Sequence, residues 1–133
     1  MITKTNADKQ KAKALYTMAQ ITLERLDQLD STKYPTNSLN DYYDIIHKLL
    51  EALGAIEGVK TKSEGAHQIL IDYICKQHQL GEATRIFLQE MRDYRNRISY
   101  EGFTIKPEYI TQNKQRIITI INTLTKKTQE LLK

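Results

Sequence analysis

The stretch 39-LNDYYDIIHKLLEALG-54 decides the fold, because its apolar residues recur at the spacing of one helix face. Intervals of three and four residues place side chains on one side of a helix. The apolar positions are Tyr42, Ile45, Ile46, Leu49, Leu50 and Leu53. Ser38 precedes the stretch as an N-cap, and Gly54 and Gly58 follow it as helix-ending residues. We therefore predict a core-facing helix over Leu39–Gly54.

Helical periodicity continues on the N-terminal side of this stretch. A helix is predicted over Ala7–Leu29, with Thr5 and Asp8 spaced as a capping box. Between the two helices, 31-STKYPTNS-38 is typical of a loop that interrupts helical structure.

Three further helices are predicted on the C-terminal side. Thr61 and Glu64 form a second possible capping box, for a helix that continues to Gln79. A fourth helix is predicted over Glu82–Ser99, and a fifth begins at Pro107, because proline is preorganised for the first helical position. Short connections favour antiparallel neighbours. We expect an all-α, up-and-down antiparallel bundle of four or five helices, formed by residues 1–133 as a single domain.

Composition places the chain among globular proteins. Of its 133 residues, 40% are hydrophobic and 27% are charged, with only five glycines and two prolines. No apolar run is long enough for a membrane span, and the N-terminal segment lacks the apolar run of a signal peptide. These features predict a cytoplasmic protein without a membrane partner. The net charge of +4 mildly favours anionic partners such as RNA.

The segment 91-MRDYRNRISYEGF-103 contains an arginine where an apolar residue is expected. The apolar stripe of the fourth helix is formed by Phe87, Met91, Tyr94 and Ile98. Arg95 lies only about 40° from Met91 around the helix axis. Its aliphatic stem could pack while the guanidinium reaches outward or pairs with a carboxylate such as Glu90 or Asp93. Alternatively, its planar guanidinium holds a phosphate.

Residues 95-RNRISY-100 resemble the signature of the HEPN domains, small all-helical proteins marked by an arginine and a histidine a few residues later. The stretch 42-YYDIIHKLLEALGAIEGVKTKSEGAHQILIDYI-74 is similar in pattern to the central helices of archaeal and bacterial members. The resemblance implies a HEPN-like bundle that forms a homodimer and cleaves RNA without a metal. It also implies a toxin-antitoxin or defence module, with a small nucleotidyltransferase as antitoxin partner.

The chain departs from this family pattern at Tyr100, which stands where the pattern has histidine. Tyrosine, with a reference pKa near 10, would donate a hydrogen bond but act as a poor base. The resemblance makes Arg95 and Tyr100 the candidate catalytic residues, although the missing histidine argues for weak activity or none. Arg92, Arg95, Asn96 and Arg97 are the candidate RNA-binding residues. Tyr100 could instead cap the helix end and bury its ring.

The sequence is also compatible with two other functions. A non-catalytic dimeric module could keep the fold and bind a nucleotide or a protein, and a plain helical scaffold would make Arg95 structural. Other chemistry is not indicated, and no metal or cofactor is expected. His47, His67 and His78 have no histidine or cysteine partner at i, i+4, so packing or exposure is expected for each. Cys75 is expected to be a buried, inert thiol.

Overall fold

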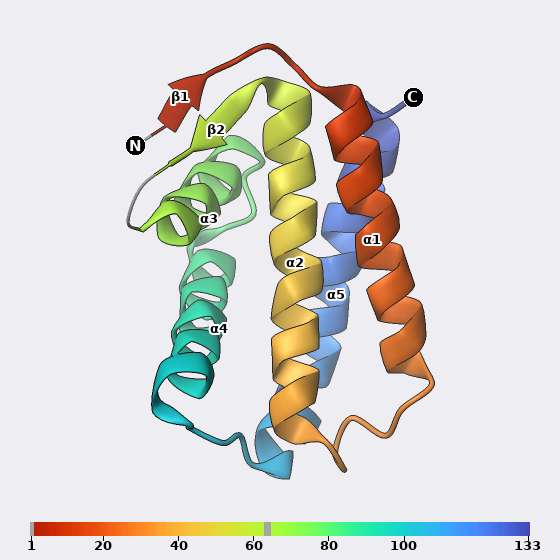
Figure 1. Ribbon diagram of the computed structural model, residues 1–133, viewed down its shortest axis with the longest axis vertical. Helices are drawn as coiled ribbons and strands as arrows, with labels where there is room; N and C mark the ends of the chain where they lie inside the picture. Colours follow the sequence, from red (N-terminus) through yellow and green to blue (C-terminus); the bar gives the residue numbers. More distant parts are fainter. Residues whose placement is uncertain (1, 63–64) are drawn as a thin grey trace.

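The computed structural model of the chain describes residues 2–62 and 65–133, and helices dominate this part of the chain (Figure 1). The prediction of an all-α helical bundle is confirmed. In chain order the elements are β1 (Ile2–Lys4), α1 (Lys9–Asp27), α2 (Pro35–Glu57), β2 (Val59–Thr61), α3 (Ala66–Gln77), α4 (Glu82–Glu101) and α5 (Pro107–Leu131).

Helix α2 is the centre of the bundle and contacts each of the other four helices. Helix α1 packs along one side of it, α5 lies behind it, and α3 and α4 lie on the opposite side from α1 (Figure 1). The short connection 78–81 joins α3 and α4 into a helical hairpin. Among the residues that the structure describes, no helix is both long and apolar enough to span a lipid bilayer.

The main hydrophobic core surrounds α2, as the sequence pattern predicts. All six apolar positions identified in its sequence are buried: Tyr42, Ile45, Ile46, Leu49, Leu50 and Leu53. Buried residues of α1, α3, α4 and α5 complete this core. A second, smaller cluster forms where the end of α4 meets the start of α5, around Leu39, Ile105 and Ile110. Tyr94 and Ile98 pack against this second cluster, whereas Phe87 and Met91 belong to the main core. The predicted apolar stripe of α4 therefore packs against both clusters.

The predicted bounds of α2 were too short at both ends. The helix begins at Pro35, not at Leu39, because the fixed φ of proline suits the first helical position. It continues beyond Gly54, which is buried within the helix, and ends at Gly58 in the left-handed conformation with φ of 70°. A side chain at residue 54 would contact the Val59 carbonyl oxygen, so glycine permits close packing there.

Both predicted capping boxes need correction. Asp8 is the N-cap of α1, and its carboxylate accepts a hydrogen bond from the Lys11 backbone N–H at 2.9 Å. Thr5 instead donates its backbone N–H to the Gly58 carbonyl oxygen at 2.7 Å. Thr61 lies in a strand that the sequence pattern did not predict, since β1 and β2 form a short antiparallel ribbon. Glu64 lies outside the described residues.

Candidate functional site

The second half of α4 carries two arginines on neighbouring turns, Arg92 and Arg95. Burial of Phe87, Leu88 and Met91 holds the helix against the core. Arg95 is half-buried, as its place on the apolar stripe predicts. Within residues 2–62 and 65–133, neither arginine forms an ion pair, so the pairing with Glu90 or Asp93 considered above is not found.

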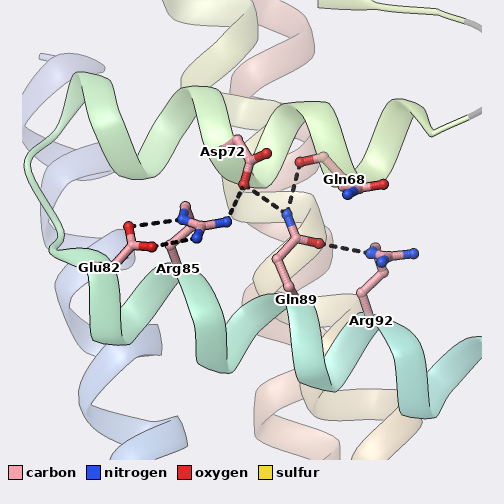
Figure 2. Close-up of polar contacts among 6 residues, drawn as sticks. All are labelled: Gln68, Asp72, Glu82, Arg85, Gln89 and Arg92. Atoms are coloured by element: carbon pink, nitrogen blue, oxygen red, sulfur yellow. Dashed lines mark hydrogen bonds and ion pairs between the residues drawn. The ribbon is translucent and has the colours of Figure 1, made fainter.

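Hydrogen bonds between α3 and α4 fix the position of Arg92 (Figure 2). The Gln89 side-chain nitrogen donates to the Asp72 carboxylate and to the Gln68 backbone oxygen, both at 2.9 Å. The Gln89 side-chain oxygen accepts from Nε of Arg92 at 2.8 Å. The two Nη atoms of Arg92 make no hydrogen bond within the described ranges, so they can bind an external acceptor.

Arg85 differs from its neighbours on α4 because its charge is already compensated. It donates to both oxygens of Glu82 and to the Asp72 carboxylate at 3.1 Å (Figure 2). These carboxylates raise the pKa of Arg85 above its ordinary value. The guanidinium therefore joins α3 to α4 and offers little charge to a ligand.

Two histidines meet near the arginines. His47 of α2 and His67 of α3 stack with ring centroids 3.7 Å apart and an interplanar angle of 25°. The Tyr43 hydroxyl lies 3.3 Å from Nδ1 of His67, so one of these two groups donates to the other. Burial raises the pKa of Tyr43 above its ordinary value, and the phenol keeps its proton.

Glu51 orients one ring of this pair. Its carboxylate lies 2.9 Å from Nδ1 of His47, one helical turn away on α2. A carboxylate can only accept, so Nδ1 carries the hydrogen and Nε2 is left as the basic atom of the neutral ring. This hydrogen bond lowers the pKa of Glu51 below its ordinary value, and the carboxylate stays ionised near neutral pH. Glu51 also lines a pocket of about 290 Å³, together with Asp8, Lys11 and Lys60.

The surroundings of His67 disfavour its protonation. Burial first, then the charges of His47 and Arg95, lower its pKa to about 4, and Arg92 contributes in the same direction. Arg92 lies near the histidine pair, because Gln89 joins its Nε to the backbone oxygen of Gln68, the residue that follows His67. The site thus combines positive charge without a carboxylate partner, a neutral imidazole and a carboxylate–histidine pair. Together these groups can bind a phosphate and accept a proton.

The remaining candidate residues are Asn96, Arg97 and Tyr100. The Arg97 guanidinium lies over the Phe103 ring, 4.1 Å from its centroid, and Asn96 is half-buried. Tyr100 is 83% exposed near the end of α4. A separation of five residues places Arg95 and Tyr100 about 140° apart around the helix. The two side chains therefore leave the helix on different faces.

Local spacing did not predict the histidine pair, because His47 and His67 lie on different helices and have no histidine or cysteine partner at i, i+4. The spacing of His47 and Glu51, i and i+4, could have indicated their hydrogen bond. Their proximity to His67 depends on how α3 packs against α2, which no local pattern encodes. His78 is also paired across helices, with Glu57.

No metal site is found in the part of the chain that the structure describes, where no three His, Cys, Asp or Glu side chains are grouped to hold an ion. Cys75 is buried, and burial raises the pKa of its thiol to about 11. The thiol is therefore protonated at neutral pH, and the expectation of an inert cysteine is supported.

Comparisons with protein-family models, curated proteins and solved structures give no match to this chain.

Proposed function

We propose that this protein is a HEPN-like, cytoplasmic RNA-binding protein that holds the RNA backbone through Arg92 and Arg95. The observation that carries the proposal is the pair of arginines on α4, one of them joined through Gln89 to the residue after His67, without a carboxylate partner in the described residues. Half-buried guanidinium groups are stabilised when they meet an anion. A phosphodiester supplies that anion and matches the planar guanidinium.

The resemblance of 95-RNRISY-100 to the HEPN signature supports RNA as the source of the phosphate. The net charge of +4 favours association with a polyanion. Metal-independent endoribonuclease activity is part of this proposal, within a toxin-antitoxin or defence module that includes a nucleotidyltransferase partner.

The test is the affinity for a fluorescent single-stranded RNA, measured by anisotropy in EDTA. Loss of a charge-assisted contact costs about 1.5–3 kcal/mol, so Arg95→Ala should weaken binding by about tenfold or more. Arg92→Ala should weaken it in the same direction. Arg25→Ala is the matched control, because Arg25 lies on α1, is paired with Asp41 and carries the same charge. Equal affinity for wild type, Arg95→Ala and Arg92→Ala would reject the proposal.

A second candidate function is a dimeric module that binds a nucleotide or a protein without catalysis. The exposure of Tyr100 favours it, because exposed tyrosines are frequent in protein interfaces. In this case Tyr100→Ala should shift the protein from dimer to monomer in light scattering. Both candidate functions predict a homodimer in which the C-terminal end of α4 in one protomer faces that of its partner. Light scattering that gives a monomer throughout the micromolar concentration range would contradict this prediction.

A further inference from the structure

The histidine missing from position 100 has two possible replacements in the folded chain, His47 and His67. They come from different helices, yet their rings stack at 3.7 Å. Gln89 of α4 accepts a hydrogen bond from Nε of Arg92 at 2.8 Å and donates at 2.9 Å to the backbone oxygen of Gln68, the residue after His67. Phosphate-binding and proton-accepting groups are therefore neighbours here, although they are far apart in the sequence.

We propose that His47, oriented by Glu51, is the catalytic base of a metal-independent RNA cleavage, and that His67 donates a hydrogen bond to the phosphate that Arg95 binds. This inference rests on the RNA-binding function proposed above and assigns its chemistry to residues outside the HEPN-like signature. The substrate class is single-stranded RNA with a free ribose 2′-hydroxyl.

His47 has the orientation that a base requires. Its Nδ1–H donates to Glu51 at 2.9 Å, which fixes the tautomer and leaves the lone pair on Nε2. The ionised carboxylate stabilises the imidazolium that forms when Nε2 takes a proton, as it does in other carboxylate–histidine pairs. Glu51 is therefore a positioning residue.

His67 suits a different role because it is held neutral. Two imidazolium rings stacked at 3.7 Å would repel each other, so His67 must stay uncharged when His47 is protonated. When the Tyr43 hydroxyl donates to Nδ1 of His67, the ring proton lies on Nε2. That N–H can donate to a phosphate oxygen without losing its proton.

The reaction is an internal transfer at phosphorus and needs no metal or oxidant. The 2′-hydroxyl gives its proton to Nε2 of His47, the bond from O2′ to phosphorus forms, and the bond from phosphorus to O5′ breaks. O5′ takes a proton from water, and the resulting hydroxide takes the proton from His47. The products are a 2′,3′-cyclic phosphate and a 5′-hydroxyl, and the enzyme returns to its starting state.

The first experiment measures RNA cleavage and RNA affinity in EDTA for the same set of variants. His47→Gln should slow cleavage by about 100-fold or more, the usual contribution of a general base, while RNA affinity is retained. His78→Gln is the matched control, because His78 is a half-buried histidine with a carboxylate partner, Glu57, outside the site. It should cleave at nearly the wild-type rate. Circular dichroism checks that each variant is folded.

The second experiment measures kcat and KM separately for Glu51→Gln. The carboxylate lies 2.9 Å from Nδ1 of His47, so its neutral replacement removes the charge that stabilises the imidazolium formed during the reaction, and kcat should fall while KM stays near the wild-type value. A residue with only a structural role would lower the free energy of unfolding without this selective loss of kcat. This variant keeps the proposal testable if substitutions at His47 prevent folding.

The outcomes separate this inference from the proposed function. Wild-type protein that binds RNA through Arg95 but leaves it intact overturns this inference and the nuclease part of the proposed function, while RNA binding through the arginines still stands. Full cleavage by His47→Gln, combined with loss of cleavage in Tyr100→Phe, assigns the chemistry to the HEPN-like signature. That result also overturns the inference. If wild type does not bind RNA, both proposals fail. A wild-type kcat in Glu51→Gln counts against the role of His47 as base.

Discussion

The imidazole rings of His47 and His67 stack at 3.7 Å although they belong to different helices, α2 and α3. Because Glu51 hydrogen-bonds to His47, this contact joins the carboxylate of Glu51 on α2 to His67 on α3, and α3 packs against α4. The geometry of this site therefore depends on the packing of three helices, and changes in that packing should alter both the stability of the protein and the reactivity of the site.

Stability should depend on pH through His67. Its pKa is about 4 in the folded chain against an ordinary value of 6.5, so between these values the unfolded state binds more protons than the folded state. The free energy of unfolding should therefore be highest above about pH 6.5 and fall as the pH drops toward 4. Urea unfolding across this range should show a shallower fall for His67→Gln than for wild type. Identical pH dependence in the two proteins would contradict the environment described for His67.

Gly58 should tolerate substitution poorly. Its φ is +70°, and a Cβ atom there would lie 2.5 Å from the Thr5 carbonyl oxygen, which is backbone and cannot move freely. Left-handed strain alone costs about 1 kcal/mol, and the clash adds to it, so Gly58→Ala should cost about 2 kcal/mol or more. Gly65→Ala is the control, because Gly65 has φ of +78° but no heavy atom of the described residues within 4 Å of its Cβ position. Chemical denaturation that gives equal losses for the two variants would show that Thr5 does not constrain this turn.

The core around α2 should be sensitive to cavities. Leu49 is fully buried in the main core, so Leu49→Ala should lower the free energy of unfolding by about 2–5 kcal/mol. Met18 on α1 is 49% exposed, and Met18→Ala should change the free energy of unfolding by about 0.5 kcal/mol or less. Thermal and urea unfolding provide the measurement. A small loss at Leu49 would indicate that α2 is less central than its contacts imply.

Arg97 should contribute to stability more than to RNA affinity. Its guanidinium lies over the Phe103 ring, a contact worth about 0.5–1 kcal/mol at an exposed site. Arg97→Ala should therefore lower stability by this amount while it weakens RNA binding less than Arg95→Ala does. The two measurements are urea unfolding and RNA anisotropy, and a larger loss of affinity for Arg97→Ala would move the binding site toward the end of α4.

The helical bundle could be predicted from the sequence because local patterns encode most of it. The period of the apolar residues identified α2 and its buried face, and Pro107 marked the start of α5. Pro35 likewise marks the start of a helix, α2, but the polar residues around it led to the prediction of a loop. The ribbon of β1 and β2 was missed because three-residue strands carry almost no periodic signal, and their pairing joins distant segments.

The candidate site was only partly predictable for a related reason. The position of Arg95 on an apolar stripe can be calculated from helix geometry, and its half-buried state agrees with it. The identity of its neighbours cannot be obtained in this way. His67 reaches His47 through the packing of α3 on α2, and Gln89 reaches Asp72 across the α3–α4 hairpin.

The most direct test of phosphate binding at this site is the titration of His67 by NMR, with and without saturating single-stranded RNA. Free protein should show a pKa of about 4 for this ring, held low by burial and by the charges of His47 and the arginines. A phosphate bound by Arg92 and Arg95 would offset their charge, so the pKa of His67 should rise when RNA is added. RNA that binds to the protein but leaves the titration of His67 unchanged would show that it binds elsewhere and would contradict the account.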